Sequence, residues 1–193
     1  MHEIRALHDD TTITVYQAYG PAIALPALRA QRFAPPFKRD RMTWIKPSFL
    51  WMMYRSGWAT KEGQEHVLAI RLQRTGFDAA VAGACLSHYS PAVHAGRAAW
   101  SAQLRTSPVR VQWDPERDLH LRPLDHRSLQ LGLSGPAVHD YVDTWTTAID
   151  DVTPLARTIH ALVRSGSLDE ARTLLPPERP YAPADPHSSH EDS

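Results

Sequence analysis

Hydrophobic and polar residues alternate in several short segments of the chain, and such segments are typical of β-strands. The run at 12–18, Thr-Ile-Thr-Val-Tyr-Gln-Ala, is rich in β-branched and aromatic residues and changes face with every residue. Residues 67–72, 109–113 and 127–133 show similar runs of apolar side chains, and residues 41–45 form a shorter one. The sequence therefore predicts five strands.

Apolar residues recur every three or four positions between and after these strands, which predicts helices. The first helix spans residues 22–33, with Pro21 in its first turn. A second helix is opened by Pro47 or Ser48 and closed by Gly57. Residues 87–104 are expected to form a loop that could include a short helix. Further helical segments are predicted at residues 76–88, 137–149, 153–165 and 167–175.

The predicted order of elements is β-α-β-α-β-α-β-β-α-α, without an internal repeat. Short strands separated by uneven helices favour an α+β fold, with a mixed or antiparallel sheet flanked by helices, over a doubly wound sheet. A chain of 193 residues suits one domain, which we place at residues 1–175. From residue 176 on, Pro, Ser, His and Asp dominate, and we expect residues 176–193 to be a disordered tail.

The formal net charge is +0, so no global field draws the protein to nucleic acid or to a membrane. The charge is nevertheless uneven, because residues 1–60 hold eight Lys and Arg against four Asp and Glu. Residues 169–193 hold two against six. The basic first third could meet an anionic ligand, although two oppositely charged solvated surfaces explain the same distribution.

A single cysteine, Cys85, allows no internal disulfide, which fits a reducing compartment. Apolar runs fall short of the ~18 residues of a membrane span, and a signal-peptide core is lacking. We therefore expect a cytoplasmic protein without a membrane partner. The sequence leaves the oligomeric state open.

Several kinds of catalytic site are disfavoured by their missing motifs. Eleven histidines are scattered without HExxH, Cys-x-x-Cys or paired ligand spacing, so we expect no metal. The glycine-rich phosphate loops GxxxxGK[ST] and GxGxxG are absent, and so is the GxSxG nucleophile elbow.

Three sets of polar and aromatic residues near strand ends remain as candidates for a site. Polar groups there are costly to bury unless they are paired, and aromatic rings beside Arg and Lys suit stacking and phosphate binding. Structural ion pairs and an aromatic helix that simply packs would explain the same residues. The sets are Tyr16, Gln17 and Tyr19; Arg41, Trp44, Lys46, Ser48, Trp51 and Arg55; and Gln112, Asp114, Glu116, Arg117 and Gln130.

The chain also resembles the bacterial and fungal family known as domain of unknown function 4291, over about residues 3–165. The resemblance rests on residues 16–19, 36–37, 39–55, 112–117 and 128–130, of which the central segment 39–55 is long enough to be specific. That family name implies no activity.

The order of elements in the first half is also similar to ADP-ribosyltransferase-like domains, which have a split sheet. In these domains a polar residue on the first strand and a Glu or Gln on a late strand contact NAD. The resemblance places Gln17 at the first position and Gln130 or Glu116 at the late one. Ser48 and Tyr54 fall near the position after the second strand.

The same resemblance implies that Arg41, Lys46 and Arg55 hold the pyrophosphate. The aromatic and polar residues Tyr16, Tyr19, Trp44 and Trp51 would complete the NAD site. Where these domains have His or Arg, the chain has Gln17, and its late strand offers Gln130 instead of a glutamate. An amide stabilises an oxocarbenium-like state less well than a carboxylate does.

Three hypotheses follow. The first is an ADP-ribosyltransferase-like enzyme that uses NAD as a substrate and modifies a nucleic acid. The second is a non-catalytic module that binds a nucleotide, RNA or DNA. The third is an interaction or structural protein in which residues 41–58 are core.

Overall fold

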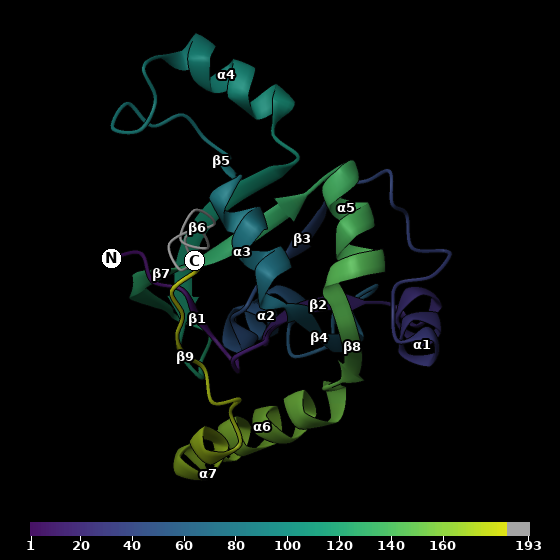
Figure 1. Ribbon diagram of the computed structural model, residues 1–193. Helices are drawn as coiled ribbons and strands as arrows, with labels where there is room; N and C mark the ends of the chain where they lie inside the picture. The colour runs from purple at the N-terminus through teal and green to yellow at the C-terminus, as the bar shows by residue number, and fades with distance from the viewer. Residues whose placement is uncertain (185–193) are drawn as a thin grey trace, which may run out of the picture.

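Two main β-sheets meet edge to edge in the computed structural model, which describes residues 1–184 (Figure 1). The first has three antiparallel strands in the order β2-β4-β8. The second has the order β3-β7-β6-β5 and is antiparallel except that β5 pairs parallel with β6. The strands are β1 (Arg5–Ala6), β2 (Thr12–Tyr19), β3 (Thr43–Ile45), β4 (His66–Gln73), β5 (Cys85–Leu86), β6 (Val109–Arg117), β7 (Pro123–Leu133), β8 (Thr146–Asp151) and β9 (Arg179–Pro180).

The sheets are joined by an isolated antiparallel bridge between β2 and the residue after β3. There the N–H of Tyr16 donates to the carbonyl of Lys46 at 2.7 Å. The predicted α+β class, with mixed and antiparallel sheets flanked by helices, is confirmed. The C-terminal parts of β2 and β3 therefore lie together at this bridge.

The three-stranded sheet separates two hydrophobic cores, because side chains alternate between its faces. On the central strand β4, Leu68, Ile70 and Leu72 belong to the core shared with the four-stranded sheet. Val67 and Ala69 face the other core. All five are buried, so β4 reads as a continuous apolar run instead of an alternating one.

The helices divide between these cores. Helices α1, α3 and α5 contribute to the core between the sheets, whereas α2, α6 and α7 contribute to the other. Helix α4 projects away from both sheets (Figure 1). None of the helices within residues 1–184 is long and apolar enough to cross a membrane. The helices are α1 (Pro21–Ala30), α2 (Phe49–Ser56), α3 (Arg74–Ala82), α4 (Arg97–Thr106), α5 (Pro136–Asp140), α6 (Thr153–Ser165) and α7 (Leu168–Thr173).

Helix α2 begins and ends where the sequence predicts. The Ser48 hydroxyl accepts the N–H of Trp51 at 3.1 Å and so caps the first turn. Gly57 ends the helix with φ of 59°, a left-handed conformation that suits glycine. Local chemistry therefore fixes the orientation of the aromatic side chains on α2.

The predicted helix at residues 137–149 is wrong in its second half. The chain forms α5, then a five-residue π-helical turn (Tyr141–Trp145), and then strand β8. Strand β8 pairs with β4 and provides an outer strand of the three-stranded sheet. Tertiary pairing thus overrides the helical spacing, helped by the β-branched residues Thr146, Thr147 and Ile149.

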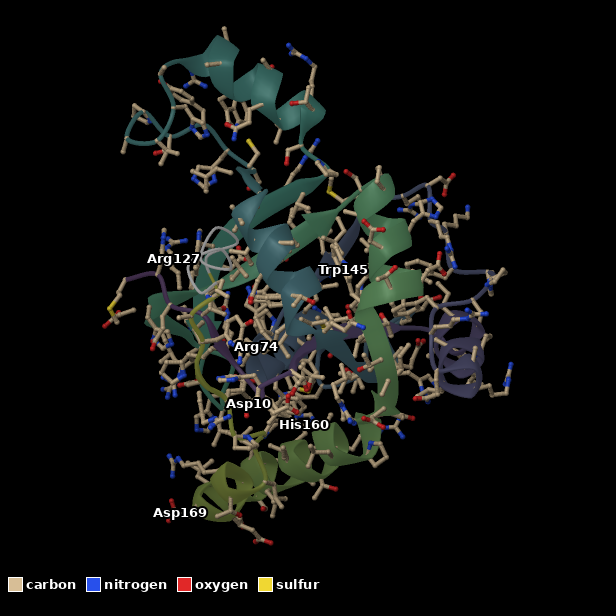
Figure 2. The ribbon with its side chains drawn as sticks, in the orientation of Figure 1. Asp10, Arg74, Arg127, Trp145, His160 and Asp169 are labelled. Carbon is tan, nitrogen blue, oxygen red and sulfur yellow. The ribbon has the colours of Figure 1, made fainter. Side chains whose placement is uncertain are left out.

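Trp145, at the end of this turn, packs directly on Gly76 of α3 (Figure 2). A Cβ atom at residue 76 would lie 2.3 Å from the indole ring, so only glycine permits the contact. The predicted helix 76–88 is also shorter than expected. It ends at Ala82, and Cys85 is buried in the short strand β5.

The predicted boundary of a disordered tail at residue 176 falls too early. Strand β9 pairs with β1, and the Tyr181 side chain is buried with its hydroxyl on Asp78 at 2.5 Å. Glu178 binds the start of α2. The segment up to residue 184 therefore belongs to the folded domain, and residues 185–193 lie outside the part that the structure describes.

Candidate functional site

A cleft of about 780 Å³ opens where the two sheets meet. It lies beside the ends of β2 and β3, one face of β6 and β7, helix α2, and the loops around residues 36–42 and 62–64. Its lining comprises Gln17, Ala18, Tyr19, Ile23, Pro36, Phe37, Lys38, Arg41, Met42, Thr43, Trp44, Lys46, Trp51, Met52, Arg55, Glu62, Gly63, Gln64, Gln112 and Gln130.

One face of the four-stranded sheet forms the polar wall of the cleft. On β7, Leu129, Leu131 and Leu133 are buried in the core, so the residues between them point to the opposite face. There Gln130 lies opposite Gln112 of β6. The alternation that builds the core therefore presents two amides to the cleft.

The Gln130 amide is available to a ligand. Its side chain makes no hydrogen bond to any residue between 1 and 184, although only 9% of the residue is exposed. Its amide atoms are not among the fully buried unpaired polar atoms of the described residues, so they reach the cleft, where water or a ligand can bind them. The cleft thus contains a polar group that a ligand can satisfy.

Trp44 is positioned by a glycine on the neighbouring strand. Gly132 of β7 pairs with Trp44 of β3, and a Cβ at residue 132 would lie 2.9 Å from the indole ring. The ring therefore covers the backbone of β7 at the edge of the cleft. With Trp51 on α2, it provides a second indole for stacking on a planar ligand.

Gln17 holds the junction between the sheets. The two N–H groups of its amide nitrogen are shared among three acceptors, the Thr43 hydroxyl at 2.7 Å, the Trp44 carbonyl at 2.9 Å and the Tyr19 hydroxyl at 3.0 Å. Its amide oxygen accepts the Tyr141 hydroxyl at 2.7 Å. Every polar atom of this side chain is used, so Gln17 positions β3 and Trp44 instead of offering a free group to a ligand.

Lys46 lies at the floor of the cleft, and its side chain is 1% exposed. Its ammonium group is 3.2 Å from Asp114 and 3.9 Å from the centre of the Trp51 ring. Burial lowers the pKa of Lys46 to about 8, although Asp114 and Glu116 oppose this shift. The side chain is therefore mainly charged at pH 7.

Asp114 is itself fixed in place. One carboxylate oxygen binds Lys46, and the other accepts the Gln112 amide at 2.9 Å. Gln112 thereby links the ion pair to the cleft wall. The floor of the cleft is thus a connected polar network, which stabilises a charged group that burial would otherwise disfavour.

The electrostatic balance of the lining favours an anion. Among the described residues, Lys38, Arg41, Lys46 and Arg55 line the cleft with the carboxylate of Glu62, and a second carboxylate, that of Asp114, already balances Lys46. Arg41 and Arg55 are exposed and have no carboxylate partner within residues 1–184. Guanidinium groups without such a partner can bind phosphate with two hydrogen bonds each.

Glu116 and Ser48 do not line the cleft. The Ser48 hydroxyl donates to Glu116 at 2.7 Å, and the same carboxylate oxygen accepts the N–H of Arg117. Glu178 accepts the N–H of Phe49 at 2.7 Å. Burial, with help from Glu116, raises the pKa of Glu178 to about 8. Glu116 and Glu178 therefore bind the start of α2, on the side of the helix away from the cleft.

Tyr16 and Tyr54 also lie away from the cleft. Tyr16 is buried against Phe49, and it borders a separate cavity of about 270 Å³ on the other side of the three-stranded sheet. Tyr54 is exposed and carries the Arg117 guanidinium 3.6 Å from its ring centre. The structure thus brings together Gln17, Tyr19, Arg41, Trp44, Lys46, Trp51, Arg55, Gln112 and Gln130, and leaves Tyr16, Ser48, Tyr54 and Glu116 outside.

Sequence reasoning missed several residues of the site. Lys38 and Gln64 come from loops without a recognisable motif, and Tyr141 reaches Gln17 from 124 positions away. The role of Gly132 could have been suspected, because a glycine within a predicted strand often marks a close approach of another group. The part of the chain that the structure describes holds no cluster of three His, Cys, Asp or Glu residues fit to bind a metal.

Comparisons with known proteins give one result. A search among curated proteins found no match. A family model described as "Domain of unknown function" matches residues 3–181, which is most of the chain. The chain therefore belongs to the family called domain of unknown function DUF4291.

Proposed function

We propose that the cleft binds NAD and that the protein is an ADP-ribosyltransferase-like enzyme. The observation that carries this proposal is the meeting of Lys46, two indoles and the free Gln130 amide in one cleft at the division of the sheet. A split sheet is what the resemblance to ADP-ribosyltransferase-like domains implies. Gln130 on the late strand β7 lines the cleft and supports the assignment, whereas Gln17 on β2 supports it only by position, because its amide is fully bonded within the protein.

Each part of NAD has a suitable partner in the cleft. Arg41, Lys46 and Arg55 carry the positive charge in the lining that would attract and bind the pyrophosphate. The planar rings of NAD suit Trp44 and Trp51. The volume of about 780 Å³ lies in the range of ligand pockets for molecules of this size.

The reaction would break the bond between ribose C1′ and nicotinamide N1. The electron pair leaves with nicotinamide, which becomes neutral, while the acceptor bonds to C1′ and releases a proton to water. Gln130 offers an amide oxygen to the positive ribose, whereas Glu116 points to Ser48 outside the cleft. We therefore expect slow transfer, because an amide stabilises the oxocarbenium-like state less than a carboxylate does.

A second candidate is a non-catalytic nucleotide-binding module. The position of Glu116 favours it, because the only carboxylate that lines the cleft belongs to the exposed loop residue Glu62. This module would bind NAD, ADP-ribose and nucleoside phosphates through the same rings and cations. It would release no nicotinamide.

The test is a calorimetric titration with NAD, combined with chromatographic detection of nicotinamide. We expect binding that weakens about tenfold or more in Arg55→Ala, because a charged hydrogen bond to phosphate contributes roughly 1.5–3 kcal/mol. Arg157→Ala removes a similar exposed charge from α6 and serves as the control. Binding without nicotinamide release selects the non-catalytic module, and failure of NAD and of nucleoside phosphates to bind rejects both functions.

A further inference from the structure

The segment between β5 and β6 forms an arm that projects from the body of the protein (Figure 1). We call residues 87–108 the cationic arm; its helix α4 has no buried residue. Between Asp78 and Asp114 the chain has no Asp or Glu, but it has Arg97, Arg105 and Arg110. The arm and the strand that follows it therefore carry positive charge alone.

Contacts within the arm position its helix and the Arg97 side chain. The Trp100 indole N–H donates to the Leu86 carbonyl at 2.9 Å, and this bond ties α4 to β5. The Trp100 ring lies 6.3 Å from the ring of Tyr89. The Arg97 guanidinium lies 4.7 Å from the centre of the Tyr89 ring. A cationic group and two aromatic rings are thus arranged on one side of the arm.

The arginines of this region lack carboxylate partners. Within residues 1–184, no carboxylate comes within salt-bridge distance of Arg97, Arg105 or Arg110. The Nε atom of Arg110 is buried and has no hydrogen-bond partner. Three arginines with unused donors in a stretch without acidic residues fit an anionic partner.

Arg110 connects the arm to the cleft. It lies on β6 two residues before Gln112, so both side chains point to the same face of the sheet. Its neighbour on β7 is Gly132, the residue that Trp44 covers. Trp44 of β3 and Arg110 of β6 both pair with Gly132, from opposite sides of β7, so their backbones lie two strand spacings, about 10 Å, apart.

We propose that the cationic arm, continued by Arg110, binds the sugar-phosphate backbone of a single-stranded nucleic acid and leads one of its nucleotides into the cleft. The delivery of a nucleotide rests on the proposed function, since it makes the nucleic acid the acceptor of the transferred group. Backbone binding by the arm does not depend on it.

The chemistry of the arm favours a nucleic acid over an acidic protein. Arginine and aromatic rings together suit both the phosphates and the stacked bases of a single strand. An acidic protein surface would not need the rings. Close approach of the backbone is also possible, because small exposed side chains cover the arm, at Ala92, Ala95, Ala98, Ala99 and Ala102.

The test measures binding of labelled 20-nucleotide single-stranded RNA and DNA by fluorescence anisotropy over a range of salt concentrations. We expect Arg97→Ala/Arg105→Ala to weaken binding at least tenfold. The slope of log affinity against log salt should fall by about 1.4, or 0.7 for each lost phosphate contact. The matched control is Arg157→Ala/Arg164→Ala, which removes two exposed arginines from α6.

Three outcomes overturn the inference: no binding of either strand, equal weakening in the two double variants, or equally strong competition by polyglutamate. The last would point to an acidic protein instead. Comparison of the affinities for RNA and for DNA shows which of the two sugar-phosphate backbones the protein binds. NAD binding, measured on the same arm variant, should be unchanged, so failure of the NAD site and failure of the arm can be told apart.

Discussion

Lys46 and Glu178 lie on either side of the segment that starts α2, and they respond to burial in opposite ways. Lys46 precedes the helix and faces the cleft, whereas Glu178 binds the first helical N–H behind it. Burial lowers the pKa of Lys46 to about 8 and raises the pKa of Glu178 to about 8. At pH 7 Lys46 therefore keeps its charge, and Glu178 is mainly neutral.

The difference comes from their partners. Lys46 has the Asp114 carboxylate at 3.2 Å and the Trp51 ring, which favour the charged form. Glu178 is flanked by Glu116, which disfavours its charge, and no cation within residues 1–184 forms a salt bridge with it. Of the two groups only Lys46 forms a salt bridge within the described residues, and Asp114 balances its charge, so the net positive charge of the cleft comes from Lys38, Arg41 and Arg55.

The largest expected effect comes from Lys46→Met. This substitution leaves Asp114 without its cation, and breaking a buried pair costs about 3–5 kcal/mol of unfolding free energy. Urea denaturation at pH 7 measures it, and Lys38→Met, at an exposed cleft cation, should stay within about 0.5 kcal/mol of wild type. Adding Asp114→Asn should recover part of the loss. A Lys46→Met protein as stable as wild type would contradict the role of the pair.

The second effect concerns Glu178 and pH. The pKa of Glu178 rises from 4.5 in the unfolded chain to about 8 in the folded protein. Between these two pH values only the folded state keeps the proton. Its contribution to stability is thus complete below pH 4.5 and is lost as pH rises to 8. Glu178→Gln keeps an acceptor for Phe49 but cannot titrate, so it should gain about 2–4 kcal/mol relative to wild type between pH 5 and pH 8.

Urea denaturation at several pH values measures this gain, and Glu170→Gln on the exposed face of α7 is the control. The neighbours that face Glu178 are Glu116 of β6, Arg5 of β1 and the N–H of Phe49. Parallel pH curves for Glu178→Gln and wild type would show that Glu178 is not protonated in the folded protein.

A smaller effect is expected on ligand binding. Lys46 loses its charge as pH rises through about 8, so NAD affinity should fall roughly tenfold, or ~1.4 kcal/mol, between pH 7 and pH 9. Titration calorimetry at both pH values measures it. Lys46→Arg stays charged over this range and should remove the pH dependence. A wild-type affinity that does not change with pH would separate Lys46 from anion binding.

A last effect is expected from Ser48→Ala, which changes the segment between the two groups. It removes the cap of α2, which contributes about 1 kcal/mol, and the hydroxyl that donates to the Glu116 carboxylate, which contributes about 1.5–3 kcal/mol. The pH dependence of stability that we assign to Glu178, and that of NAD affinity that we assign to Lys46, should both persist. Thermal unfolding checks this against Ser87→Ala, whose hydroxyl makes no hydrogen bond within the described residues. No loss of stability would show that the cap is dispensable.

Much of the cleft could be predicted because its parts are local. The segment 41–55 contains Arg41, Trp44, Lys46, Trp51 and Arg55, and all five line the cleft. The sequence also groups the polar residues of β6 and β7 into one set. Their convergence with this segment could not be predicted, because it depends on the pairing of β3 with β7 and on the bridge between the sheets.

The predicted roles of individual residues were less secure, because a residue type does not reveal its partners. Gln17 and Gln130 are both glutamines on strands, yet one is fully bonded and the other is free. Glu116 and Glu178 are both acidic, and only the folded chain brings them together at the start of α2.

The sequence by itself determined the features that depend on neighbours along the chain. Alternation fixes β2 and β7, and the hydroxyl of Ser48 and the glycine at 57 fix the ends of α2. The tertiary structure alone decided β8, the Gln17–Tyr141 bond and the position of Glu178, because each requires contact between segments far apart in the chain. Local preferences are weak beside the free energy of strand pairing and burial, so these long-range contacts decide where the two disagree.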